Sequence, residues 1–171
     1  MKPIARVSRL LLPLVLAAPM AQAADLMSLS GEGRGAGAIV SDPQKPGREG
    51  RCRLTATPLV AGKEMRLKGR CATDQGSAEL GMRFVLYDGG VLAGGIASST
   101  HDETVQFDGR LEGNVARLAS RKPVRVGEIS GTSRFTLTLR DATHFRLVQW
   151  LEPETGAARI GMVEMDFVSV Q

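Results

Sequence analysis

The chain reads RCRLTATPLVAGKEMRLKGRC over residues 51–71, two runs of alternating apolar and polar residues on either side of a turn sequence. If a two-residue turn forms at Ala61-Gly62, Cys52 lies directly opposite Cys71. Because side chains alternate between the two faces of a strand, both cysteines then share one face with the apolar residues of the hairpin. This stretch therefore predicts a β-hairpin, and a disulfide between Cys52 and Cys71 that joins its strands.

The same register decides what lies on each face of the hairpin. It pairs Leu54 with Gly69 on the cysteine face and Arg53 with Arg70 on the other face, where two like charges are mildly destabilising unless an acid intervenes. Closing a loop of this length contributes roughly 3 kcal/mol in the chain-entropy model. A redox-active or metal-binding thiol pair is disfavoured, because the spacing is far from Cys-x-x-Cys and no histidine or third cysteine is near in the sequence.

The first 23 residues have the pattern of an export signal. An apolar core at residues 10–18 follows a positively charged start, and Ala21-Gln22-Ala23 is a small-x-small cleavage site. The apolar run is too short to span a bilayer, and no cysteine follows the cleavage site to carry a lipid anchor. We therefore expect a periplasmic or secreted protein without a stable membrane anchor, cleaved after Ala23, and an oxidising compartment that permits the disulfide.

The remaining residues 24–171 have the length of one domain. Three of the 22 basic residues but none of the 18 acidic ones belong to the signal, so the net charge falls from +4 to +1. This balance gives no electrostatic reason to expect nucleic acid or an anionic membrane surface as a partner.

Short stretches of apolar–polar alternation continue through the whole mature chain, and none shows a helical period over twelve residues. Asp88-Gly89-Gly90 is a strong hairpin turn between two of them. We predict an all-β fold, a single antiparallel barrel of the lipocalin or avidin kind with about eight to ten strands, with a sandwich as the alternative. The aromatic residues are expected in its core. The expected strands outside the hairpin are residues 26–33, 37–40, 78–87, 91–98, 104–111, 115–118, 124–129, 135–140, 144–151 and 160–170.

Glycine stands at every second position of one stretch, at Gly31, Gly33, Gly35 and Gly37. A strand with this spacing has one face without side chains, so another backbone, a bulky aromatic ring or a ligand can approach it closely. A dinucleotide-binding loop is excluded by context, because no βαβ unit can be built around it. We treat these four glycines as a candidate ligand or close-contact face.

No other group of residues predicts chemistry. His101 and His144 lack the further ligands of a zinc site and the Gly-x-Ser-x-Gly turn of a serine hydrolase, so we expect both at the surface. Glu164 and Asp166 share one face of a strand, which we expect to be the exterior. A loose basic stretch is interpreted as a solvated loop rather than a site for an acidic partner; it comprises Arg117, Arg121, Lys122 and Arg125. We expect no catalytic, metal or cofactor site, and a protein that is not an enzyme.

Three motifs carry a family resemblance: the glycines of residues 31–37, Arg51-Cys52-Arg53-Leu54, and Gly69-Arg70-Cys71-Ala72. Together they resemble small exported β-barrel proteins of alphaproteobacteria, a group with no assigned activity. The resemblance covers about half of the mature chain, and it implies a fold and a compartment only.

A fainter resemblance links the cysteine pair and the Asp88-Gly89-Gly90 turn to the periplasmic inhibitors of secreted metalloproteases. That family implies an eight-stranded, single-disulfide barrel that threads its N-terminal segment into the protease, here about Ala24 to Ser30. The chain departs from it in length and in having its only tryptophan at Trp150, away from the cysteines.

These observations predict a non-enzymatic exported binding protein. Its ligand is expected to be a small apolar molecule held inside the barrel, or a protein surface. The alternative function is inhibition of a secreted metalloprotease through the N-terminal segment.

Overall fold

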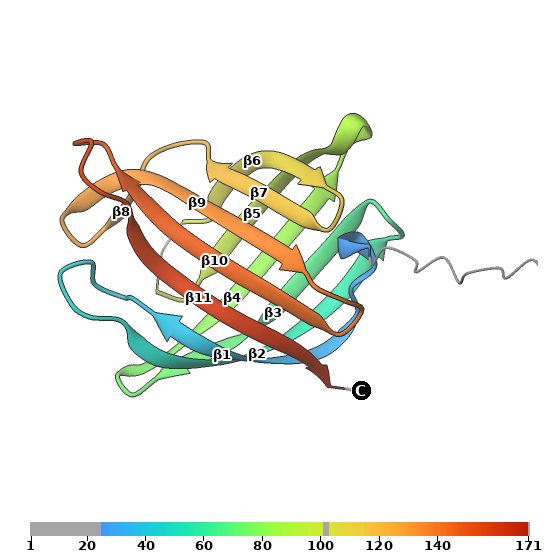
Figure 1. The fold of residues 1–171 in the computed structure, drawn as a ribbon, viewed down its shortest axis with the longest axis horizontal. Helices are drawn as coiled ribbons and strands as arrows, with labels where there is room; N and C mark the ends of the chain where they lie inside the picture. The colour runs from blue at the N-terminus through green and yellow to red at the C-terminus, as the bar shows by residue number, and fades with distance from the viewer. Residues whose placement is uncertain (1–24, 101–102, 171) are drawn as a thin grey trace, which may run out of the picture.

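The computed structural model describes residues 25–100 and 103–170, so the expected export signal and His101 lie outside the described residues. The described chain is almost entirely β-strand (Figure 1). Its elements are η1 (Leu26–Ser28), β1 (Gly31–Ile39), β2 (Arg48–Val60), β3 (Glu64–Thr73), β4 (Gly76–Leu86), η2 (Asp88–Gly90), β5 (Val91–Ser98), β6 (Val105–Glu112), β7 (Val115–Ser120), β8 (Val124–Val126), β9 (Ile129–Leu139), β10 (His144–Pro153) and β11 (Ile160–Val170).

The strands form one closed antiparallel barrel (Figure 1). Each strand from β1 to β6 pairs with the next, β7 pairs with β9, and β9, β10 and β11 follow in order until β11 pairs with β1. The short strand β8 continues the line of β7 along β9, so ten strands close the barrel and β8 is an extra one. The prediction of an all-β barrel is confirmed.

The hairpin of β2 and β3 has the predicted register, with Cys52 opposite Cys71 and a disulfide between them. The predicted two-residue turn is wrong by one residue, because the turn consists of Ala61, Gly62 and Lys63. A register shift between Pro58 and Val60 absorbs the extra residue. A three-residue turn with one residue at positive φ and an adjacent bulge is a common hairpin form, and Gly62 supplies φ of 65°.

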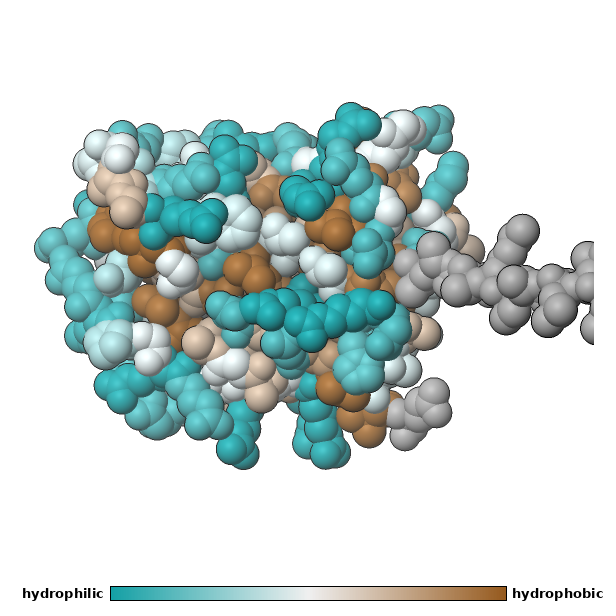
Figure 2. Space-filling view, viewed as in Figure 1, coloured by the Kyte–Doolittle hydropathy of each residue, from teal (hydrophilic) through white to brown (hydrophobic). Residues whose placement is uncertain are grey.

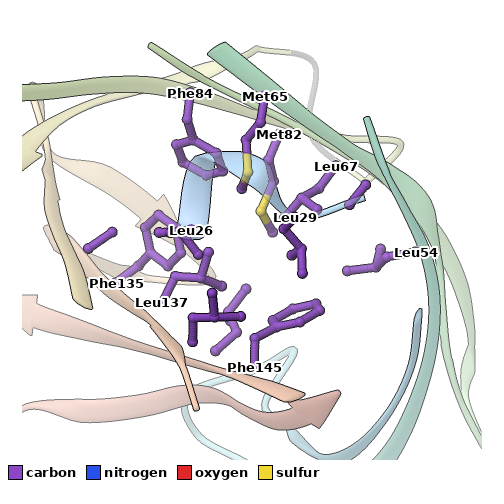
Figure 3. Close-up of a cluster of buried hydrophobic side chains, with 14 of the residues drawn as sticks. Leu26, Leu29, Leu54, Met65, Leu67, Met82, Phe84, Phe135, Leu137 and Phe145 are labelled. Carbon is purple, nitrogen blue, oxygen red and sulfur yellow. The ribbon is translucent and has the colours of Figure 1, made fainter. Parts of the chain in front are cut away.

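Apolar side chains from every long strand fill the inside of the barrel (Figure 3). All five phenylalanines are buried there, as the sequence predicts, but Tyr87 is 56% exposed and Trp150 is only half-buried. Phe84 and Phe107 each pack against the ring of Phe135, with ring centroids 5.7 and 5.9 Å apart. The core therefore depends on phenylalanine, and the two aromatics with polar atoms lie outside it.

Residues 25–29 close one end of the barrel. Leu26, Met27 and Leu29 are buried among the core side chains, and the Asp25 carboxylate caps the short helix η1 by accepting a hydrogen bond of 3.0 Å from the backbone N–H of Met27. Figure 3 shows Leu26 and Leu29 pointing toward Leu137 and Leu54. We call this end, where the β2–β3 and β4–β5 turns also lie, the η1 end of the barrel.

Candidate functional site

The glycine face of β1 points into the barrel and lies against the protein's own aromatic rings. Gly35 is directly opposite Phe167, whose ring occupies the space a Cβ atom of Gly35 would need. The Phe145 ring lies within van der Waals distance of Gly33 and stacks on the ring of Phe167 with centroids 4.5 Å apart. Gly37 instead lies against the backbone carbonyl of a β11 residue, and Gly31 is exposed with φ of 94°.

A void remains beside this face at the η1 end. It has a volume of about 10 Å³ and is bounded by Leu29, Gly33, Leu54 and Phe145 among others. A space of that size is at the lower limit for a single water molecule. An organic ligand at this point of the interior would have to displace core side chains.

A polar cluster occupies the turn between β9 and β10. The Asp141 carboxylate accepts hydrogen bonds from the backbone N–H groups of Thr143 and His144, at 2.8 and 2.9 Å, and from the Thr143 hydroxyl at 2.8 Å. It also lies 2.9 Å from Nδ1 of His144. The hydrogen bond with the His144 side chain, and then that with the Thr143 backbone, hold the pKa of Asp141 well below its ordinary value.

This cluster superficially contains the parts of a catalytic triad but not its geometry. Thr143 Oγ1 and the Asp141 carboxylate both contact Nδ1 of His144, whereas a triad places the nucleophile and the acid on opposite ring nitrogens. All three residues lie at or near the surface of a tight turn. The arrangement is that of an Asx turn that fixes the start of β10.

The other residues considered from the sequence lie on the outer wall. Glu164 and Asp166 are exposed, as predicted, and their carboxylates pair with Arg146. In the basic stretch, Arg121 makes two hydrogen bonds of 2.7 and 2.8 Å to the Asp108 carboxylate, which raise the pKa of the guanidinium. Exposed pairs of this kind contribute little to stability.

A groove of about 310 Å³ crosses the outer wall where β10, β11 and β1 run side by side. A register shift between Gln149 and Trp150 places Trp150 opposite Gly161, whose missing side chain leaves the space beside the indole open. In the views of Figures 1 and 2 the β9–β11 wall faces the reader, and hydrophobic patches there lie between hydrophilic residues. The groove is lined by Ala38, Val40, Val148, Gln149, Trp150, Arg159, Gly161, Met162, Val163 and Glu164.

Two contacts hold the indole of Trp150 in this groove. The Arg159 guanidinium lies 5.6 Å from the ring centroid, within the range of a cation–π interaction. The indole Nε1–H donates a hydrogen bond of 3.4 Å to Glu152, whose carboxylate also accepts one of 2.6 Å from Arg134. The Arg134 hydrogen bond, with a smaller effect from Trp150, lowers the pKa of Glu152. The ring is therefore fixed in place while part of its surface stays open to solvent.

The groove was not expected from the sequence, because Trp150 was expected in the core with the phenylalanines. Strand alternation carries the correct signal, since Trp150 has the same parity as Arg146 and the opposite parity to Phe145 and Leu147. The groove also depends on the irregularity of β11 beside Gly161, which no local pattern indicates.

Fold and surface together define this chain as a closed, single-disulfide antiparallel barrel with a filled core and an aromatic groove on its outer wall. Neither known protein-family models nor curated proteins match the chain. Among the described residues, no helix has the length and apolar character needed to cross a membrane.

Proposed function

We propose that this protein is a non-enzymatic binding protein that holds a protein partner against the outer wall of its barrel, with the Trp150 groove as the contact site. The observation that carries the proposal is the position of Trp150, the only tryptophan of the chain, outside a core built from phenylalanine. Tryptophan is one of the residue types enriched among the energetic centres of protein interfaces.

The groove's size and chemistry support a partner side chain rather than a free metabolite. Its volume of about 310 Å³ lies at the small end of ligand pockets, and it is open along the wall. Val148, Met162 and Val163 contribute apolar atoms to the lining of the groove, which also includes Arg159 and Glu164, the latter paired with Arg146. An apolar side chain flanked by polar groups on the partner would match this pattern.

The packing of the interior favours a protein surface over the other ligand expected from the sequence, a small apolar molecule inside the barrel. The core side chains are buried against one another, and the void beside Gly33 holds at most about one water molecule. Inhibition of a metalloprotease receives no support from residues 25–30, because Leu26, Met27 and Leu29 fold into the barrel instead of extending from it.

The proposed compartment is the periplasm or the extracellular medium. The Cys52–Cys71 disulfide is compatible with an oxidising environment, where such bonds persist. The signal-like sequence of residues 1–23 supports the same location.

The test places a photo-crosslinking phenylalanine derivative at Val148, inside the groove, in the host cell. We expect an adduct of one defined mass, lost when Trp150→Ala is added, and no such adduct from a matched outward position, Ala93 on β5. Thermal unfolding of the variants controls for folding. The proposal would be overturned if the adduct still formed when Trp150→Ala was added, or if the crosslinker at Val148 gave no adduct at all.

A further inference from the structure

The charges on the outer wall are distributed unevenly around the barrel. On the half formed by β6 to β11, arginines pair with carboxylates of neighbouring strands. These pairs are Arg117–Glu112, Arg121–Asp108, Arg134–Glu152, Arg140–Asp166 and Arg146–Glu164. Five arginines of this half are thus neutralised by carboxylates of the barrel itself.

Strands β1 to β3 carry two paired cations, Arg48 with Asp74 and Arg51 with Glu49, and beside them a group of cations that form no ion pair. Arg34, Arg53 and Arg70 lie directly opposite one another on three adjacent strands, and all three are exposed. Lys68 and Arg66 follow along β3 with the same outward orientation. We call these five residues the basic wall.

Within the described residues, no carboxylate forms an ion pair with any member of the basic wall. Arg70 donates hydrogen bonds to the Ser77 hydroxyl, a neutral acceptor. Glu79 lies directly opposite Arg70 on β4, and Glu32 and Glu64 lie two residues from Arg34 and Arg66 on the same faces of β1 and β3. The five positive charges thus face three negative ones, of which the Glu64 carboxylate is already paired with Arg83. Like charges opposite one another destabilise a sheet, and an external anion relieves this repulsion.

An apolar tip lies at the end of the basic wall. Four of the six large apolar side chains exposed among the described residues lie beside the two turns at the η1 end, namely Leu59 at 37%, Val60 at 50%, Tyr87 at 56% and Val91 at 44%. The two turns lie side by side, since the backbone N–H of Leu86 donates a hydrogen bond of 2.7 Å to the carbonyl of Lys63. From this tip, strand β3 begins at Glu64, whose carboxylate pairs with Arg83, and continues on the same face with Arg66, Lys68 and Arg70.

We propose that this end of the barrel docks on an anionic lipid bilayer. The apolar tip enters the headgroup region, with Tyr87 at the level where amphipathic aromatic rings are favoured, and the basic wall lies against the lipid phosphates. A soluble polyanion would satisfy the basic wall but would leave the apolar tip in water. The combination of both features therefore selects a lipid surface.

The experiment measures co-sedimentation of the purified protein with two kinds of vesicle, phosphatidylcholine alone and equal parts phosphatidylcholine and phosphatidylglycerol. We expect binding only to the anionic vesicles, weakening as salt is added because the contacts are exposed. The variant Arg34→Gln/Arg53→Gln/Arg70→Gln should lose more than about tenfold in affinity. Val60→Ser/Tyr87→Ser should also bind less, since it removes apolar contact with the headgroup region.

The matched control, Lys45→Gln/Lys122→Gln/Arg125→Gln, removes the same charge from exposed residues at the opposite end of the barrel and should bind like the unmodified protein. Thermal unfolding of each variant shows that it remains folded. The proposal would be overturned if both triple variants lost the same affinity for anionic vesicles. It would also be overturned if the unmodified protein bound neutral vesicles as well as anionic ones, or did not bind anionic vesicles. If heparin abolishes vesicle binding while Val60→Ser/Tyr87→Ser binds vesicles like the unmodified protein, the basic wall would be assigned to a soluble polyanion instead.

Discussion

The ring of Phe167 lies directly over the bare backbone of Gly35, its cross-strand partner, and Phe145 stacks on the other side of that ring. A methyl group at Gly35 would overlap the Phe167 ring, which cannot move away because Phe145 lies behind it. We therefore predict that Gly35→Ala lowers the free energy of unfolding by roughly 1–3 kcal/mol, the usual effect of overfilling a packed core. Urea denaturation monitored by circular dichroism measures this change in the free energy of unfolding.

Two further variants test whether the loss of stability comes from this steric overlap or from any substitution in β1. Ala36→Val changes the neighbouring exposed position and should alter stability by less than about 0.5 kcal/mol. Adding Phe167→Leu should make Gly35→Ala less harmful, giving a positive coupling in a double-mutant cycle. Additive effects of the two substitutions would contradict the proposed contact.

The helix η1 is predicted to act as part of the core. Leu26 and Met27 are 1% and 0% exposed, so Leu26→Ala or Met27→Ala should each destabilise the protein by roughly 2–5 kcal/mol. Ser28→Ala, at an exposed position of the same turn, is the matched control and should change little. If all three substitutions were neutral in urea denaturation, the segment would be a free arm, as the inhibitor hypothesis requires.

The disulfide is predicted to stabilise the barrel through the loop it closes. Cys52 and Cys71 are 19 positions apart, and a loop of that length corresponds to roughly 3 kcal/mol in the chain-entropy model. Cys52→Ala/Cys71→Ala should lower the midpoint of urea unfolding, and dithiothreitol should lower that of the unmodified protein similarly. If the double variant were as stable as the oxidised unmodified protein, the disulfide would contribute nothing to the free energy of unfolding.

Trp150 offers a direct optical check of the groove. Because its indole lies on the outer wall, acrylamide should quench its fluorescence in the folded protein, which a core tryptophan would resist. Arg159→Ala removes the cation over the ring and should increase the quenching constant. Lys122→Ala, an exposed change elsewhere, should leave it unchanged. Weak quenching in all three proteins would place the ring inside the barrel.

The hairpin register was predictable because several independent signals agree on it. The cysteine pair and the apolar alternation of β2 and β3 both require Cys52 opposite Cys71, and a one-residue slip would turn the whole apolar set outward. The turn length was not predictable from this agreement. A bulge at residue 59 restores the register after a longer turn, so two different turns give the same pairing farther along the strands.

The surface features were harder to predict because they depend on strands that are distant in sequence. The pairing of Arg53 with Arg70 follows from the hairpin alone, but Arg34 joins them only once β1 is placed beside β2. The groove likewise requires β1 and β10 on either side of β11. Net charge is a sum over the whole chain, so it does not show which cations of the outer wall are paired with carboxylates and which are not.

The Asp141 turn gives stability a predicted dependence on pH. Its carboxylate has a lowered pKa in the folded protein, chiefly through the hydrogen bond with His144. A depressed folded-state pKa means that the stabilisation is fully present above the unfolded value of about 3.9 and is lost as the pH falls through the folded value. Asp141→Asn keeps the side-chain shape but removes the charge, so it should lower Tm at pH 7, and the difference from the unmodified protein should shrink in acid.

Thermal unfolding of both proteins from neutral to strongly acidic pH measures how the difference between their Tm values changes. Glu154→Gln is the control, since its side chain is exposed in the β10–β11 loop, and it should follow the unmodified protein at every pH. A Tm difference for Asp141→Asn that stays constant down to low pH would mean that the amide substitution, rather than the loss of charge, weakens the turn. In that case the hydrogen bonds from Thr143 and the His144 backbone, and not the ionised carboxylate, would hold the start of β10.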